Sequence, residues 1–287
     1  EAVLLNVKRG HTTGDTKKSI AILKDLGFKI NAHYMLGLPG STKDMDLAGL
    51  KELFSNQDYR PDMMKIYPCL VMKGTELYDT WKEGSYTELK TEDAARIIAE
   101  FKKDVPEYCR IMRIQRDIPT NFTEAGVDRT NLRQYVQLLM SELGYKCRCI
   151  RCREAGRAAK IDNINIHTKQ YEASNSKEFF ISIDDVENDV LLGFCRMRFP
   201  SQILRQEITD NSSIIRELHV YGQMASLGQQ GNVQHRGLGS RLLKEAESIA
   251  LSNGKDKMVI ISGVGVREYY KKFGYELEGP YMSKRLI

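Results

Sequence analysis

One short stretch near the end of the chain constrains the fold more than any other feature of the sequence. Gln234-His235-Arg236-Gly237-Leu238-Gly239-Ser240 follows a strand-like run, Arg216 to Val220, and opens a helical pattern from Ser240 to Leu251. Glycines let the backbone approach a ligand closely, and the unpaired N–H groups at the start of a helix favour an anion. The stretch therefore predicts a pyrophosphate-binding strand, loop and helix. An ordinary glycine turn before a helix is the alternative.

The length and composition favour two domains. The chain has 287 residues, 41% of them hydrophobic, and domains usually run about 100–200 residues. No apolar run approaches the roughly 18 residues that cross a bilayer, and the first residues lack the regions of a signal peptide. We therefore expect a cytoplasmic protein with no membrane contact. Its six cysteines are expected to be reduced, so clustered cysteines indicate metal or redox chemistry.

Residues 1–108 alternate helical and strand patterns. The spacing of apolar residues predicts helices over Thr16 to Leu26, Lys43 to Phe54 and Thr91 to Lys103, with Thr91 as an N-cap, and strands over Lys29 to Leu36 and Met63 to Pro68. Such repetition makes a parallel sheet or barrel that collects ligands at the carboxyl ends of its strands. Because a complete barrel takes about 250 residues, we expect only the later part of one. Gly37-Leu38-Pro39-Gly40 is interpreted as a tight turn.

The middle segment, residues 109–160, is basic. The segment contains eleven Lys and Arg and five Asp and Glu, an excess charge of +6. This excess is larger than the net charge of the whole chain, which is +5. Such a concentration favours a polyanionic partner, because phosphate neutralisation drives nucleic-acid binding. The alternatives are a solvated charged face and arginines that neutralise carboxylates inside the domain interface, which would make them structural. The candidate phosphate contacts are Arg110, Arg113, Arg116, Arg148, Arg151, Arg153 and Arg157.

Three cysteines lie close together in the same segment. Cys147, Cys149 and Cys152 follow a predicted helix, Asn131 to Leu143. Closely spaced thiolates suit tetrahedral zinc, whose structural sites take four ligands. Cys109 is the first candidate for the fourth ligand, with Cys195 or a histidine behind it. An iron–sulfur cluster and three unliganded thiols are the alternatives.

Residues 161–287 are rich in strand patterns. Phe179 to Ile183 and Val190 to Arg198 flank an acidic turn and predict a hairpin. A late strand, Met258 to Ile261, precedes Tyr269-Tyr270-Lys271-Lys272-Phe273-Gly274-Tyr275. Together with the Gln-x-x-Gly-x-Gly spacing that ends at Gly239, these residues resemble the GCN5-related acetyltransferases, which bind acetyl-CoA.

Further strings extend the resemblance over nearly the whole chain. Lys8-Arg9-Gly10-His11-Thr12, Met35-Leu36-Gly37-Leu38-Pro39-Gly40, Cys109-Arg110-Ile111-Met112-Arg113 and Gly279-Pro280-Tyr281-Met282-Ser283-Lys284 resemble the family of the Elongator catalytic subunit in its archaeal or bacterial version. The resemblance implies an α/β chain with three parts. The C-terminal part of a radical S-adenosylmethionine (β/α) barrel, residues 1–108, is joined through a cysteine-rich zinc linker, residues 109–160, to a GCN5-related acetyltransferase α+β domain, residues 161–287.

The resemblance also implies an activity. The family modifies the wobble uridine of tRNA with acetyl-CoA and builds a carboxymethyl-type group at C5, using S-adenosylmethionine and a [4Fe–4S] cluster in the full-length protein. The implied cofactor-binding residues are Glu217, Leu218, His219, Val220, Gln234, Gly237, Leu238, Gly239, Ser240 and Tyr270, and the implied catalytic residues are Tyr269 and Tyr270.

The chain departs from the family in one respect. No three-cysteine motif for a four-iron cluster precedes Lys8, so we expect an N-terminally truncated chain without the radical step. A protein lysine acetyltransferase is the competing function, with Glu217 or His219 as its general base. Binding of tRNA without catalysis is a third alternative, and self-association stays open. The basic middle segment favours tRNA over a basic peptide.

Overall fold

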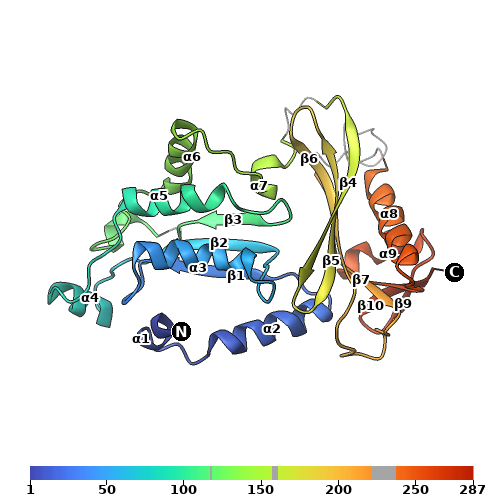
Figure 1. Ribbon diagram of the computed structural model, residues 1–287, viewed down its shortest axis with the longest axis horizontal. Coiled ribbons are helices and arrows are strands. Elements are labelled where there is room, and N and C mark those ends of the chain that lie inside the picture. The colour runs from blue at the N-terminus through green and yellow to red at the C-terminus, as the bar shows by residue number, and fades with distance from the viewer. Residues whose placement is uncertain (117, 157–160, 222–236, 287) are drawn as a thin grey trace. The chain divides into compact units, whose positions relative to one another are not determined.

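The computed structural model describes residues 1–116, 118–156, 161–221 and 237–286, which form two compact units (Figure 1). The first unit comprises Glu1–Thr16 with Asn31–Cys152, and the second comprises Lys17–Ile30 with Arg153–Ile287. The division differs from the expected domains in two places. Residues 109–152 fold into the first unit instead of forming a linker, and residues 17–30 fold into the second. Of the helices described, none has the length and apolar character that a membrane crossing requires.

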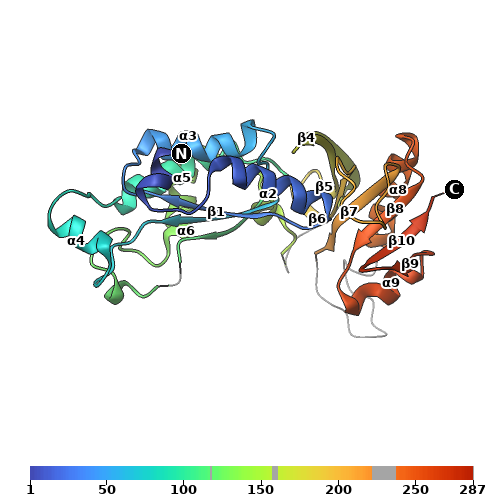
Figure 2. The ribbon, with the colours of Figure 1, turned by 90° about the horizontal axis from the view of Figure 1, so that it is seen from below.

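The first unit is built on a three-stranded parallel sheet. Its strands lie in the order β1 (Asn31–Leu36), β2 (Met63–Pro68) and β3 (Arg110–Ile114). Figure 2 shows α3 (Lys43–Ser55) and α5 (Thr91–Lys102) on one side of it. The remaining elements are α1 (Ala2–Asn6), α4 (Glu76–Lys82), a 3-10 turn (Thr120–Phe122), α6 (Leu132–Glu142) and α7 (Ile150–Arg153). The predicted alternation of strands and helices is confirmed.

One detail of α5 was predicted wrongly. Lys90 is its N-cap, whereas Thr91 is the first helical residue. The Thr91 hydroxyl donates to a carboxylate oxygen of Asp128 at 2.5 Å instead of capping the helix. A hydrogen bond from the buried Thr91 side chain to a distant residue therefore replaces the local capping bond that the sequence suggests.

The second unit is a seven-stranded sheet with helices against it. The strand order is β4-β5-β6-β7-β8-β10-β9, and only the β7–β8 pair is parallel. The strands are β4 (Ile164–Ala173), β5 (Ser176–Asp185), β6 (Val190–Arg198), β7 (Ser212–Val220), β8 (Lys257–Ile261), β9 (Glu276–Glu278) and β10 (Tyr281–Arg285). The helices are α8 (Leu238–Ser252), a 3-10 turn (Val264–Val266), α9 (Arg267–Lys271) and α2 (Thr13–Asp25), which enters this unit from Lys17.

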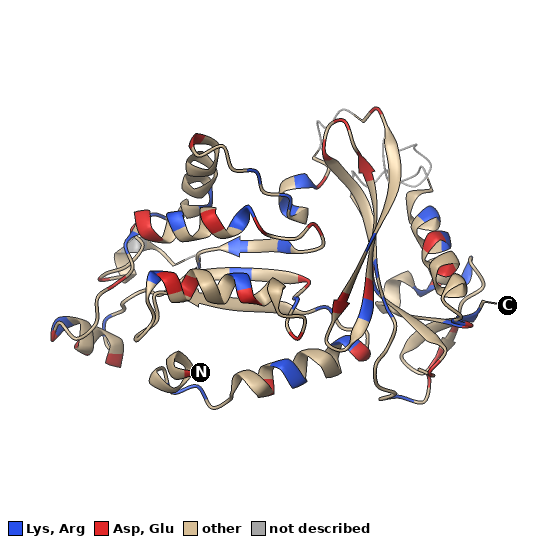
Figure 3. Ribbon diagram, in the orientation of Figure 1, with Lys and Arg blue, Asp and Glu red and all other residues tan. Residues whose placement is uncertain are grey.

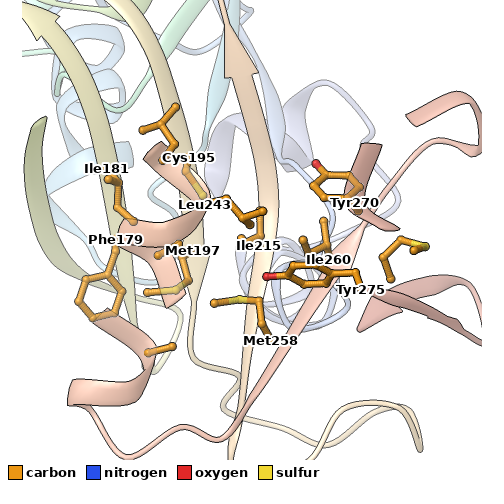
Figure 4. Close-up of a cluster of buried hydrophobic side chains, with 14 of the residues drawn as sticks. Phe179, Ile181, Cys195, Met197, Ile215, Leu243, Met258, Ile260, Tyr270 and Tyr275 are labelled. Carbon is orange, nitrogen blue, oxygen red and sulfur yellow. The ribbon is translucent and has the colours of Figure 1, made fainter. Parts of the chain in front are cut away.

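A hydrophobic core fills the space between this sheet and α8 (Figure 4). Phe179 and Ile181 of β5 meet Met197 of β6 and Leu243 of α8 there. The predicted hairpin of β5 and β6 is confirmed, with β5 continuing two residues into the expected acidic turn, to Asp185. This core fixes the strands and the helix between which the predicted loop runs.

Candidate functional site

Strands β7 and β8 separate halfway along β7. Their parallel pairing ends at Ile215, opposite Ile260, whereas the pairing of β7 with β6 continues to Val220. From Arg216 onward, β7 therefore has an edge without a ladder partner among the residues described. Such an edge offers N–H and C=O groups to an extended ligand. The four residues predicted to hold acetyl-CoA, Glu217 to Val220, lie on this segment.

The predicted glycine turn opens α8. Gly237 adopts the left-handed conformation, with φ of 69°, immediately before Leu238, and a side chain at that φ would be strained. The Ser240 hydroxyl donates to the Gly237 carbonyl at 2.7 Å. No acidic residue stands in the first turn of this 15-residue helix, so its positive end can attract an anion. Gln234 lies outside the described residues.

Three elements meet beside this turn. A Cβ placed on Gly239 would lie 2.6 Å from the Tyr269 hydroxyl oxygen and 3.7 Å from a methyl carbon of Leu218. The structure thus brings together residues of β7, α8 and α9, of which Leu218 and Tyr269 lie 51 positions apart in the sequence. Because β7 carries the open edge and α8 the helix start, this place combines both features that an elongated anionic cofactor needs.

The two candidate catalytic tyrosines have different surroundings. Tyr269 is half-buried and lies against Gly239, whereas Tyr270 is buried in the core, with its ring centroid 6.0 Å from that of Tyr275. Burial raises the pKa of both hydroxyls. Both therefore stay protonated at neutral pH and can donate a hydrogen bond or a proton.

Two cations hold the carboxylate of Glu217. Its two oxygens lie 3.1 Å from Lys29 Nζ and 2.9 Å from Arg196 Nε. The ring of His219 packs against Tyr221 at 4.5 Å between centroids. Sequence reasoning missed Lys29 and Arg196, and the one available signal was the presence of arginines, Arg196 and Arg198, within the apolar run of β6. Both carboxylate oxygens of Glu217 are therefore engaged in ion pairs within the unit.

The predicted cysteine group does assemble. The Sγ atoms of Cys147, Cys149 and Cys152 all lie within 4.8 Å of one another. Hydrogen bonds from the thiols of Cys147 and Cys152 lower the pKa of Cys149 to about 2, and the backbone N–H groups of Ile111 and Cys152 add to the effect. Three convergent sulfur atoms with backbone donors around the innermost one fit a thiolate-bound metal. The donor set therefore suits zinc or another thiophilic ion.

The fourth ligand stays a prediction. Among the described residues the group contains only the three cysteines above. Cys109 is buried, and its carbonyl accepts from the Ile150 N–H at 2.9 Å, so its backbone adjoins the cysteine loop. Cys195 is enclosed in the core of the second unit.

Sequence reasoning missed Arg133, which comes from α6. Its Nη2 donates to the Ile111 carbonyl at 3.1 Å. Burial and then Arg151 lower the pKa of Arg133, whereas the three cysteines of the group raise it. Ile111 thus lies between the arginine and the cysteines, donating to Cys149 and accepting from Arg133.

The arginines that were predicted to contact phosphate differ in how far they are buried. Arg113, Arg116 and Arg151 are exposed, Arg110 is half-buried, and Arg148 donates to Glu107 at 2.7 Å. Arg153 is only 5% exposed and forms ion pairs with Asp184 and Asp189 of its own unit. Arg153 therefore has a structural role within its own unit, and we leave it out of the candidate phosphate contacts. Arg157 lies outside the described residues.

The Gly37–Gly40 turn follows β1 and borders two cavities of about 490 and 360 Å³. The Gly37 N–H donates to Asp46 at 2.6 Å, and its carbonyl accepts from the Tyr86 hydroxyl at 2.7 Å. Hydrogen bonds from two other segments therefore hold both the N–H and the carbonyl group of Gly37 in place. Its position at the carboxyl end of a parallel strand is where α/β folds collect ligands.

In a comparison with known proteins, a different family model matches each of the two units. Residues 61–142 match the Radical_SAM C-terminal domain, and residues 151–275 match the Acetyltransferase (GNAT) family. The chain is 47% identical to the tRNA uridine(34) acetyltransferase of Methanocaldococcus jannaschii and 41% identical to Elongator complex protein 3 of Saccharomyces cerevisiae. These matches cover 97% and 100% of this chain but 54% and 53% of the relatives. The chain thus spans about half their length.

A solved structure extends the similarity to three dimensions. The Elp3 of Methanocaldococcus infernus with an N-terminal deletion superposes with a TM-score of 0.94 at 44% identity. The match covers 99% of this chain and 69% of that one.

Proposed function

Since this chain belongs to the Elongator complex protein 3 family, we propose that it takes part in acetyl-CoA-dependent modification of the wobble uridine of tRNA. The product that we propose is a carboxymethyl-type group at the C5 carbon. The observation that carries the proposal is the meeting of the open β7 edge, the Gly237–Ser240 turn and Tyr269 in one place. The proposal concerns the complete protein, of which this chain supplies the acetyl-CoA-binding part.

Each part of this place has a role in the proposal. The N–H groups at the start of α8 would bind the pyrophosphate of the cofactor, and the β7 edge from Glu217 to Val220 would pair with the amides of its extended arm. Acetyl-CoA would supply the two-carbon unit. Cleavage of the thioester by water would form the carboxyl group and release CoA, and Tyr269 or Tyr270 would donate a hydrogen bond to the departing sulfur. Burial raises the pKa of both hydroxyls, which keeps them in the protonated, donating form.

The proposed cofactors include a structural zinc ion. Cys147, Cys149 and Cys152 would hold it with Cys109 as the fourth ligand, and a closed thiolate site would stabilise the fold around it. S-adenosylmethionine and a [4Fe–4S] cluster belong to the proposal for the complete protein, because residues 61–142 match the Radical_SAM C-terminal domain. A cytoplasmic location and tRNA as the partner complete it, while self-association stays a prediction.

The surroundings of Glu217 do not favour a lysine acetyltransferase. That reaction needs a base to remove a proton from the ammonium group. The Glu217 carboxylate is instead held between Lys29 and Arg196, where a substrate ammonium group would be a third cation. The described contacts of His219, the other candidate base, are with the rings of Phe194 and Tyr221 and do not favour that role, so we propose no second function.

Turnover of acetyl-CoA separates the two activities. The chain and the full-length protein would each be incubated with acetyl-CoA and either tRNA or a lysine-rich peptide, while free CoA is measured. We expect tRNA to stimulate CoA release and the peptide to leave it unchanged. A Gly156→Ala variant should behave as the unaltered chain, since its Cβ would meet open space. Acetylation of the peptide, with no response to tRNA, would overturn the proposal.

A further inference from the structure

One face of the second unit's sheet carries a cluster of four aromatic rings. The ring centroids of Phe180 of β5 and Phe194 of β6 lie 5.3 Å apart, and those of Phe194 and His219 of β7 lie 5.9 Å apart. Tyr221, just beyond β7, completes the cluster. Its ring centroid lies 4.5 Å from that of His219 and 6.2 Å from that of Phe194. The rings therefore cross three neighbouring strands of one sheet.

The cluster lies on the face of the sheet opposite α8. Phe194 is in register with His219, and the next residues of the two strands, Cys195 and Leu218, are in register with each other. Cys195 and Leu218 belong to the core that packs against α8. Because neighbouring residues of a strand point to opposite faces, the rings of Phe194 and His219 point away from α8.

The cluster is buried at one end and exposed at the other. Phe180 and Phe194 are buried, Tyr221 is half-buried, and His219 is exposed. The guanidinium of Arg196 lies 5.0 Å from the Phe194 ring centroid and 5.4 Å from that of Phe180, which holds the buried rings in place. Phe194 and Tyr221 in turn restrict the imidazole of His219. A ring ordered in advance loses little freedom when a ligand stacks on it.

His219 stands on the part of β7 that has the open edge. The pairing of β7 with β8 ends at Ile215, and His219 belongs to the segment Glu217 to Val220, along which acetyl-CoA is proposed to lie. A ligand at the edge of a sheet can be reached from either face. One face is occupied by α8 and by the Tyr269 hydroxyl beside Gly239. The acceptor of the two-carbon unit would therefore approach from the face that carries His219.

The charges of α8 also favour the face of His219 as the side of the RNA. Figure 3 shows acidic and basic residues mixed along α8, whose sequence contains two of each. Such a helix offers no uniformly positive surface to attract phosphates. Unpaired bases of RNA loops are recognised instead by stacking on aromatic side chains, and histidine is one of these. An exposed, ordered imidazole thus suits a base from an unpaired loop.

We propose that the imidazole of His219 stacks on the uracil ring of the substrate and holds it beside the acetyl end of the cofactor. The inference rests on the proposed function, because it names the contact of the base that is modified. His219 is then a residue that positions the substrate, and its ring exchanges no proton with it. Another flat ring at this position should therefore replace the imidazole, whereas a methyl group should not.

The binding of tRNA with and without the target base tests the proposal. The full-length protein would be titrated with two fluorescently labelled tRNAs, one with uridine and one with an abasic ribose at the wobble position. His219→Ala removes the ring, and His219→Phe keeps a flat one. His167→Ala is the matched control, because His167 is an exposed histidine of β4 in the same sheet. Thermal unfolding would verify that each variant is folded, and a calorimetric titration would give its affinity for acetyl-CoA.

We expect the unaltered protein to bind the tRNA with uridine about tenfold more tightly than the abasic tRNA, which is within the range of one stacked base. His219→Ala should lose most of this preference, whereas His219→Phe and His167→Ala should keep it.

Two results would overturn the role of His219 while the proposed function stands, provided that tRNA still stimulates CoA release. One is a preference for uridine that is absent from the unaltered protein or undiminished in His219→Ala. The other is a loss of acetyl-CoA affinity in His219→Ala with the preference unchanged, which would assign the ring to the cofactor. If the unaltered protein neither binds tRNA nor releases CoA in its presence, the role of His219 and the proposed tRNA substrate both fail.

Discussion

Arg198 and Asp25 form an ion pair with 2.6 Å between Nε and Oδ1, although 173 residues separate them in the sequence. Both side chains are completely buried. Glu178 extends the pair into a network, since its carboxylate also contacts Arg198, Lys24 and Arg216 at 2.8–3.2 Å. This network joins residues 17–30 to β5, β6 and β7, and it explains why that early segment folds into the second unit.

Removing one member of the network should strongly destabilise the second unit. Asp25→Ala leaves the buried Arg198 guanidinium with one counter-charge fewer, which costs about 3–5 kcal/mol in comparable buried pairs. Denaturant unfolding, followed by circular dichroism, measures the loss. Glu268→Gln serves as the control, because it breaks an exposed pair with Lys271 and should cost about 0.5 kcal/mol or less. Equal losses in both variants would show that burial adds nothing to the pair.

The elements that could be predicted from the sequence are those with a clear apolar pattern. The strand Met63–Pro68 was predicted to the residue because its run is apolar and has clear ends. Strand β4 was missed because it lies at the edge of its sheet and its side chains are mostly exposed and polar. The burial of Arg198 and Glu178 could not be predicted either. Charged residues usually face solvent, and their partner Asp25 lies in a distant segment.

The parts of the site that could be predicted from the sequence are those whose residues lie close together in the chain. Three thiols within six residues have few ways to stay apart, so the gathering of Cys147, Cys149 and Cys152 could be inferred from the sequence. Arg133 could not, because it reaches the group through the backbone of Ile111, from another element. The bulge at Met112 is defined by the register of β3 with β2, and no local sequence pattern predicts this register. The contact of Tyr269 with Gly239 likewise depends on the packing of α9 against α8.

The cysteine group should bind one zinc ion per chain. Elemental analysis of the purified chain would measure it, and Cys149→Ser should abolish it because Cys149 is the innermost of the three donors. Cys69→Ser is the control, since Cys69 is a buried cysteine of the same unit outside the group. A chain free of metal, or an absorption band of an iron–sulfur cluster, would contradict the assignment.

Arg133 should strengthen the retention of that metal. Zinc with three or four thiolates carries a net negative charge, which a half-buried guanidinium nearby stabilises. We expect Arg133→Gln to release zinc to a chromogenic chelator about tenfold faster than the unaltered chain. The control is Arg129→Gln. Arg129 is an exposed arginine that precedes α6 and lies over the Tyr135 ring, so its replacement should leave the rate unchanged. Identical rates for both variants would make Arg133 a packing residue only.

The contact between Gly239 and Tyr269 allows a test by compensation. Gly239→Ala would place a Cβ 2.6 Å from the Tyr269 hydroxyl oxygen, so the ring must move away from the start of α8. We expect acetyl-CoA affinity to fall about tenfold in a calorimetric titration, which corresponds to about 1.4 kcal/mol. Tyr269→Phe in the same chain removes the clashing oxygen, and the nearest ring carbon then lies 3.6 Å from the new Cβ, an ordinary contact. The double variant should therefore bind as well as Tyr269→Phe alone. Full loss of binding in the double variant would mean that the Cβ blocks the cofactor itself, whereas unchanged affinity in Gly239→Ala would remove this turn from the site.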